Sequence, residues 1–139
     1  MARKGGHMLA VMNIAITVLL VIVGFINFAP VVAAISRVRV EAMYGLQAAS
    51  PDLEILLRHR AVLFGIVGTI IILSGFVPRL RVTAMACGLA SMVSFVVLVL
   101  SVPGHGQALR KVALIDGVAL VLLVVAAALT LLESSQLGA

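Results

Sequence analysis

The sequence predicts an all-α protein, an integral membrane antiparallel four-helix bundle with an interfacial amphipathic segment between helices 1 and 2. Of its 139 residues, 63% are hydrophobic and 11% are charged, whereas a soluble domain carries about 25% charged residues. The mean hydropathy is +1.29, which leaves too little polar surface to cover the chain in water. Four apolar runs approach or exceed the roughly 20 residues needed to cross a membrane: 8–29, 61–77, 82–102 and 112–132. The length fits one transmembrane domain over residues 1–139.

The first span, 8–29, is longer than the apolar core of a signal peptide, so we expect it to remain uncleaved. Pro30 should bend or end this helix. Polar and small residues recur at helical spacing along one face. Lipid offers them no hydrogen bonds, so we expect this face to point into the bundle: Asn13, Thr17, Gly24 and Asn27.

Residues 31–60 form the predicted amphipathic segment. Its first part favours an interfacial helix over a strand, because a lone strand at a membrane surface leaves its edges unpaired. Tyr44 should anchor at the interface, and Gly45 supplies a left-handed helix end. Ser50, Pro51 and Asp52 then predict the start of a helix that continues into the second span. Two charge pairs at four-residue spacing should form interfacial ion pairs: Arg37 with Glu41, and Glu54 with Arg58.

The third span should follow a tight basic loop at residues 79–81. Its small and polar residues predict a face that packs inside the bundle. A Pro-Gly-His-Gly turn at 103–106 precedes the fourth helix, which should run from Ala108 to Leu132 and be followed by a short polar tail at 133–139. The residues of the predicted packing face are Thr83, Ala86, Cys87, Ala90, Ser91, Ser94 and Ser101.

Four spans place both termini on one side of the membrane. A bare count of Lys and Arg favours the long connection as the cytoplasmic side. Two of those arginines have helical acid partners, however. The bases before the first span and the Arg79/Arg81 loop favour cytoplasmic termini instead, and this is the orientation we predict.

Asp116 is the one acidic residue in the four apolar runs, and an ionisable group at that depth is by default a candidate for function. Polar groups from several helices should converge near it at one membrane face. The predicted cluster has a net positive charge and resembles a ligand pocket: Asn27, Arg58, His59, Arg60, His105, Arg110 and Asp116.

Structural roles remain open for the same residues. One arginine can neutralise Asp116 and lock two helices together, and a lone histidine such as His59 is more often structural than catalytic. The sequence contains no ligand set suited to a metal and no bis-histidine haem pair in the spans, so no cofactor is expected. The net charge of +5 fits basic residues at helix ends, and no nucleic-acid partner is expected.

Several motifs follow one another along nearly the whole chain: Asn27-Phe28-Ala29-Pro30, Tyr44-Gly45 and PDLEILLRHRAVLFG at 51–65. This order resembles the small bacterial four-helix inner-membrane proteins of the DoxX-like type. The resemblance implies a fold and a bacterial inner membrane more than an activity, because such proteins are mostly of unknown function. Some similar proteins carry a phosphopantetheine adenylyltransferase label. This sequence does not support that activity, since it lacks a soluble nucleotide-binding fold and an HxGH motif.

The leading functional hypothesis is a non-enzymatic membrane protein. Its cationic cluster would bind an anionic lipid or amphiphile, or contact a partner membrane subunit, because Arg58 and Arg60 lie at headgroup depth. One alternative is a small proton-coupled transporter that uses Asp116. Another is a membrane enzyme acting on a lipid or isoprenoid, with Asp116 and His59 as acid and base. Small-residue faces also make a homo-oligomer plausible.

Overall fold

A computed structural model describes residues 2–45 and 50–137. Residues 46–49 of the predicted amphipathic segment, and residues 1 and 138–139 of the predicted domain, lie outside the described residues. Four described helices are long and apolar enough to cross a membrane, as in a multi-pass membrane protein. They are α1 (Ala2–Phe28), α4 (Pro51–Phe76), α5 (Arg81–Ser101) and α6 (Gln107–Leu137).

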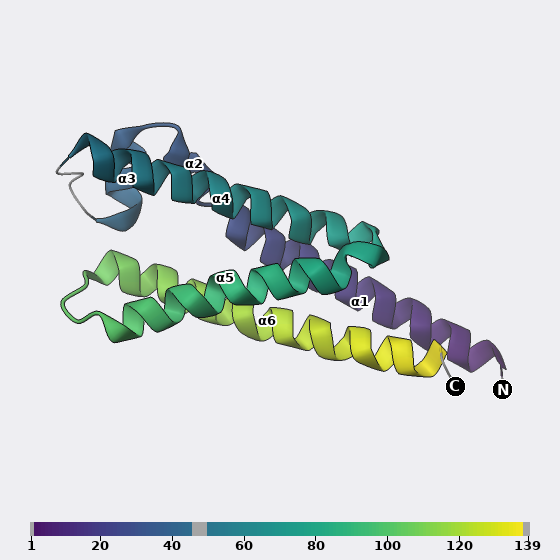
Figure 1. Cartoon of the computed structure of the whole chain (residues 1–139). Helices are drawn as coiled ribbons and strands as arrows, with labels where there is room; N and C mark the ends of the chain where they lie inside the picture. Colours follow the sequence, from purple (N-terminus) through teal and green to yellow (C-terminus); the bar gives the residue numbers. More distant parts are fainter. Residues whose placement is uncertain (1, 46–49, 138–139) are drawn as a thin grey trace.

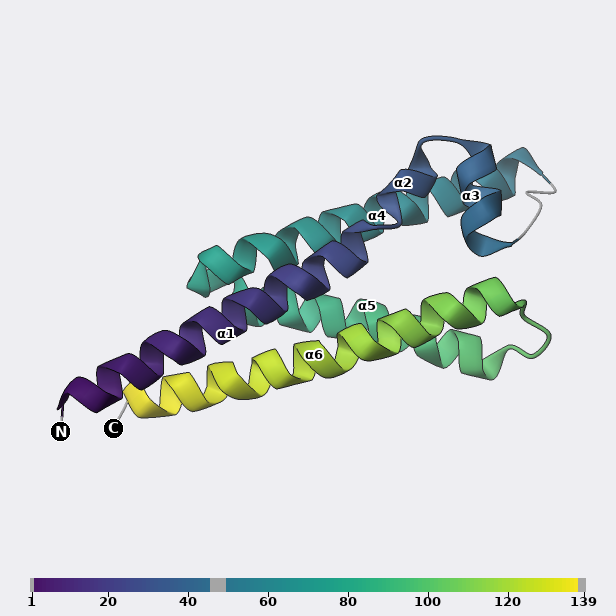
Figure 2. The same cartoon turned by 180° about the vertical axis from the view of Figure 1, so that it is seen from behind.

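The four long helices form an elongated antiparallel bundle (Figures 1 and 2). Helix α1 packs against α4 and α6, and α5 packs against the same two helices from the other side. The two ends of the chain therefore lie together at one end of the bundle. The opposite end carries the α5–α6 turn and two short helices, α2 (Val31–Ala34) and α3 (Arg37–Tyr44), which lie beside the beginning of α4.

The interior is a narrow apolar seam, and much of the apolar surface faces outward. Ile16, Leu20, Ile71, Met92 and Leu123 are fully buried where the helices meet. Large apolar residues on the outer faces are exposed, as lipid-facing side chains of a membrane bundle should be.

Two glycines allow the backbones of α1 and α4 to approach closely. A Cβ atom at Gly68 would lie 2.6 Å from the carbonyl oxygen of Gly24 and 2.7 Å from the backbone nitrogen of Phe28. Both neighbours are backbone atoms, which cannot rotate away. The small residues thus set the spacing of the two helices and the position of the end of α1, where Asn27 lies.

Local signals determine the ends of the connecting helices. The Ser50 hydroxyl accepts a hydrogen bond from the Leu53 backbone N–H at 3.2 Å, and Pro51 is the first residue of α4. Gly45 adopts φ 63° and donates its N–H to Glu41 O, so it caps α3 as predicted. The segment after Pro30 is helical as predicted, but it is divided into α2 and α3 before Ser36 caps the latter.

The predicted packing face of the third span is wrong. Most of its members are exposed on the outside of α5, whereas larger residues such as Met85, Met92 and Phe95 point inward. The hydroxyls of Ser94 and Ser101 donate to carbonyl oxygens of their own helix at 2.9 and 2.7 Å. Because these groups are satisfied locally, they need no partner in the bundle.

The ends of two helices also differ from the prediction. Helix α1 starts at Ala2, before the apolar run. Helix α6 continues to Leu137, so Glu133 lies on a helix and not in a polar tail. The α6 candidate span therefore contains two acids, Asp116 and, near its end, Glu133.

Substituting Gly68 tests the helix spacing. Gly68→Ala should destabilise the bundle by about 1 to 3 kcal/mol, because the new methyl group overlaps backbone atoms of α1. Thermal unfolding in detergent measures the effect. Gly117→Ala is the matched control, since a Cβ atom there meets nothing within 4 Å. Equal unfolding temperatures for the two variants would contradict the close crossing.

Candidate functional site

Asp116 lies in a small cavity near the end of the bundle that carries α3. The cavity has a volume of about 200 Å³ and is lined by residues of α1, α3, α4 and α6. Asp116 is 8% exposed, and the neighbouring Asn27 and Tyr44 are 2% and 3% exposed. We call this space the Asp116 cavity. Its polar lining consists of a carboxylate, an amide and a phenol.

Arg60 lies close by on α4 and is held by aromatic rings. Its guanidinium carbon is 4.3 Å from the ring centre of Phe95, 5.0 Å from that of Phe64 and 5.7 Å from that of Tyr44. These distances are typical of cation–π attraction, which strengthens when the cation is shielded from water. Ring faces stabilise the charge and use none of the five guanidinium N–H donors.

The Arg60 side chain lines a groove between α4 and α5, which we call the Arg60 groove. It has a volume of about 340 Å³. Two serines and several apolar residues line it with Arg60, so a charged head and an apolar wall lie side by side. The groove is lined by Arg60, Leu63, Phe64, Val67, Ser91, Ser94, Phe95 and Leu98.

Arg60 and Asp116 do not neutralise each other through a direct ion pair. Among the described residues, neither side chain makes a hydrogen bond or an ion pair. Phe64 lines both spaces, and Tyr44 contacts Arg60 while lining the Asp116 cavity. Burial raises the pKa of Tyr44, the Arg60 charge opposes this shift and the Asp116 charge adds to it. The Tyr44 hydroxyl is therefore within the field of both charges.

The other predicted cluster residues lie elsewhere. Arg58 donates to the Ala34 carbonyl oxygen at 2.8 Å and to Glu54 at 3.2 Å, and it lines a different surface pocket with the exposed His59. His59 and Asp116 thus belong to separate pockets, and the structure does not bring this candidate acid–base pair together.

The remaining predicted residues lie in two further places. His105 and Arg110 line a groove of about 790 Å³ between α5 and α6. Arg37 forms an ion pair of 2.9 Å with Glu41 on the surface of α3.

The aromatic residues of the site were missed or misread in the sequence. Tyr44 is not an interfacial anchor, because α3 turns its ring inward against Val40 and Ala61. Phe64 was not identified, although it lies four residues after Arg60 and therefore on the same face of α4. Phe95 comes from another helix, and its spacing in the sequence gives no signal for the contact.

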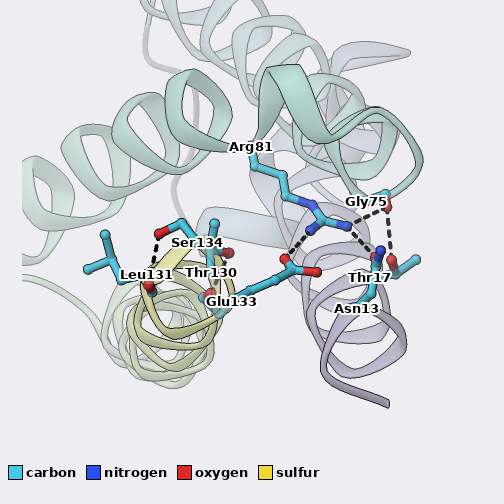
Figure 3. Close-up of polar contacts among 9 residues, drawn as sticks. Asn13, Thr17, Gly75, Arg81, Thr130, Leu131, Glu133 and Ser134 are labelled. Atoms are coloured by element: carbon cyan, nitrogen blue, oxygen red, sulfur yellow. Dashed lines mark hydrogen bonds and ion pairs between the residues drawn. The ribbon is translucent and has the colours of Figure 1, made fainter. Parts of the chain in front are cut away.

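A second polar cluster lies at the opposite end of the bundle (Figure 3). Arg81 is 3% exposed and donates to Glu133 at 3.1 Å, to the Asn13 side chain at 2.6 Å and to the Gly75 carbonyl oxygen at 3.4 Å. Thr17 donates to the same carbonyl oxygen at 2.8 Å. The cluster joins α1, α4, α5 and α6.

This cluster corrects the prediction of a bare basic loop at 79–81. Arg81 is the first residue of α5 and points into the bundle. Arg79, two residues earlier, is exposed. The Nε atom of Arg81 has no hydrogen-bond partner within the described residues, but both terminal nitrogens are occupied, so this arginine acts as a structural link.

Metal binding finds no support in the part of the chain that the structure describes. No group of three His, Cys, Asp or Glu side chains there is arranged to hold a metal ion. The lone cysteine, Cys87, is exposed on α5.

Searches of protein-family models, curated proteins and solved structures each found no match to this chain.

Replacing Glu133 tests the buried link. Glu133→Gln leaves the Arg81 charge buried without its counter-ion, which typically costs roughly 3 to 5 kcal/mol of stability. Glu54→Gln is the matched control, because its ion pair with Arg58 is more exposed and should contribute less than about 1 kcal/mol. Unfolding of both variants in detergent measures the difference. If Glu133→Gln is no more destabilising than the control, the link does not hold this end together.

Proposed function

We propose that this protein binds an amphiphile with an anionic headgroup in its Arg60 groove. The observation that carries the proposal is the guanidinium of Arg60, which three aromatic rings hold in place while its N–H donors remain unused by the described residues. A fixed guanidinium fork suits phosphate or carboxylate oxygens. Leu63, Val67 and Leu98 provide an apolar wall for an attached chain.

Energetics also support a ligand at this position. An arginine at the centre of a membrane helix disfavours insertion by about 2.5 to 3.5 kcal/mol on biological scales, and the penalty falls toward the interface. Hydrogen bonds from Arg58 to Glu54 and to the Ala34 carbonyl oxygen reduce this insertion penalty for Arg58. Arg60 makes no such contact among the described residues, so an anionic ligand would supply the missing acceptors.

We place the protein in a bacterial inner membrane, as the DoxX-like resemblance implies, with cytoplasmic termini. The exposed Arg79 and the bases at residues 3–4 support this orientation, whereas Arg37 and Arg58 at the other end have acid partners. Gly106→Cys in a Cys87→Ser background tests it. A membrane-impermeant maleimide should label that turn from outside the cell, and labelling only after permeabilisation would reverse the orientation.

Replacing Arg60 tests the proposed binding. Arg60→Gln should weaken the binding of dioleoyl phosphatidylglycerol about tenfold or more, because a charge-assisted hydrogen bond contributes about 1.5 to 3 kcal/mol. Native mass spectrometry of the protein in mild detergent measures the bound lipid. Arg58→Gln is the matched control and should retain it, because Arg58 is engaged by Ala34 and Glu54. Equal binding in wild type and Arg60→Gln would exclude this function.

A proton-coupled transporter is a second candidate, favoured by one observation. Asp116 is buried within a span and makes no direct ion pair among the described residues, as in residues that take up and release protons in transporters. Such a carboxylate would bind a proton when one face opens to water.

Proteoliposomes test this alternative. Proteoliposomes that contain the wild-type protein and a pH-sensitive dye should show voltage-driven proton flux. The Asp116→Asn variant should abolish this flux. Asp52→Asn, at the exposed start of α4, should leave it unchanged. Flux no greater than in protein-free vesicles would contradict transport.

A further inference from the structure

The few polar side chains that line the Asp116 cavity offer hydrogen-bond acceptors. The Asp116 carboxylate accepts hydrogen bonds, and Asn27 uses its amide N–H toward the Val23 carbonyl oxygen at 3.4 Å, which leaves its side-chain oxygen as an acceptor. The Tyr44 hydroxyl makes no hydrogen bond with the described residues. Acceptors and a negative charge in a partly enclosed space match a ligand with several N–H donors and a positive charge.

A primary ammonium group has this chemistry. It carries three N–H donors and one positive charge, and the rings of Tyr44 and Phe64 in the same lining attract cations. A buried carboxylate without a partner is costly in a membrane, and an ammonium ion would remove this cost. The cavity is therefore a candidate subsite for an amine.

The two subsites are adjacent and have one lining residue in common. Phe64 lines both the Asp116 cavity and the Arg60 groove, and Tyr44 joins the cavity to the Arg60 guanidinium. One ligand that carries an anion and a cation a few atoms apart can therefore satisfy Arg60 and Asp116 together. We propose that this ligand is an aminophospholipid, with its phosphate on Arg60, its primary amine on Asp116 and an acyl chain along the α4–α5 groove.

This inference rests on the proposed function. The anionic group on Arg60 belongs to the proposed function, and the inference adds an amine on the same headgroup. A purely anionic headgroup leaves Asp116 unpaired, and a purely cationic one is repelled by Arg60. Soluble phosphoethanolamine has the same charged groups, but the apolar wall formed by Leu63, Val67 and Leu98 favours a ligand with a hydrocarbon chain.

A comparison of two lipids that differ in the amine tests the proposal. Native mass spectrometry would measure the affinity of the whole chain for dioleoyl phosphatidylethanolamine and dioleoyl phosphatidylglycerol. Wild type should bind the ethanolamine lipid about tenfold more tightly, as expected for a charge-assisted hydrogen bond. Asp116→Asn should lose this preference and keep its affinity for the glycerol lipid, which also shows that the variant is folded. Asp52→Asn, the matched control, should retain the preference.

The outcomes separate this inference from the function on which it rests. Equal binding of the two lipids by wild type, or a preference that survives in Asp116→Asn, overturns the amine subsite alone, provided that Arg60→Gln weakens both lipids. If Arg60→Gln changes neither, the proposed function fails as well. If soluble phosphoethanolamine binds as tightly as the ethanolamine lipid, the ligand is not a lipid.

Discussion

The architecture depends on the neutralisation of one buried guanidinium. Arg81 lies at the start of α5, and a charge there must find its partners inside the bundle. It does so through Glu133 near the end of α6, Asn13 on α1 and the Gly75 carbonyl oxygen near the end of α4. All four spans therefore meet at one point, which determines how the α5–α6 hairpin is placed against the α1–α4 pair.

The charged side chains at the two ends of the bundle are arranged differently. At the Arg81 end, acid and base form a direct ion pair and the helices are tied together. At the other end, Asp116 is buried and Arg60 is half-buried, and they remain separate, since aromatic side chains hold the arginine on its own face of α4. The terminal nitrogens of Arg81 are hydrogen-bonded, whereas Arg60 and Asp116 make no hydrogen bond or ion pair among the described residues.

Sequence reasoning succeeded where the determinants are local. Ser50, Pro51 and Gly45 cap helices through contacts within a few residues, and the apolar runs predict the spans directly. It failed where a side chain depends on a distant partner, as with Tyr44, whose burial follows from how α3 folds against α4. The Arg81–Glu133 pair was detectable in principle. The start of one helix and the end of the next must lie together in an antiparallel hairpin, so opposite charges at those two positions indicate a link. The hypothesis of a single polar cluster included residues that do not lie together. Helical periodicity puts Arg58 and Arg60 on different faces of α4.

The distance along the bundle between Asp116 and the Arg81–Glu133 ion pair has a consequence for how the protein lies in a membrane. At 1.5 Å per residue, the rise along α6 from Asp116 to Glu133 is about 26 Å. A typical hydrocarbon core is about 30 Å thick. Asp116 and Arg81, both buried inside the bundle, can thus lie near opposite faces of one bilayer. A change in membrane thickness would therefore alter the depth of both buried charges at once.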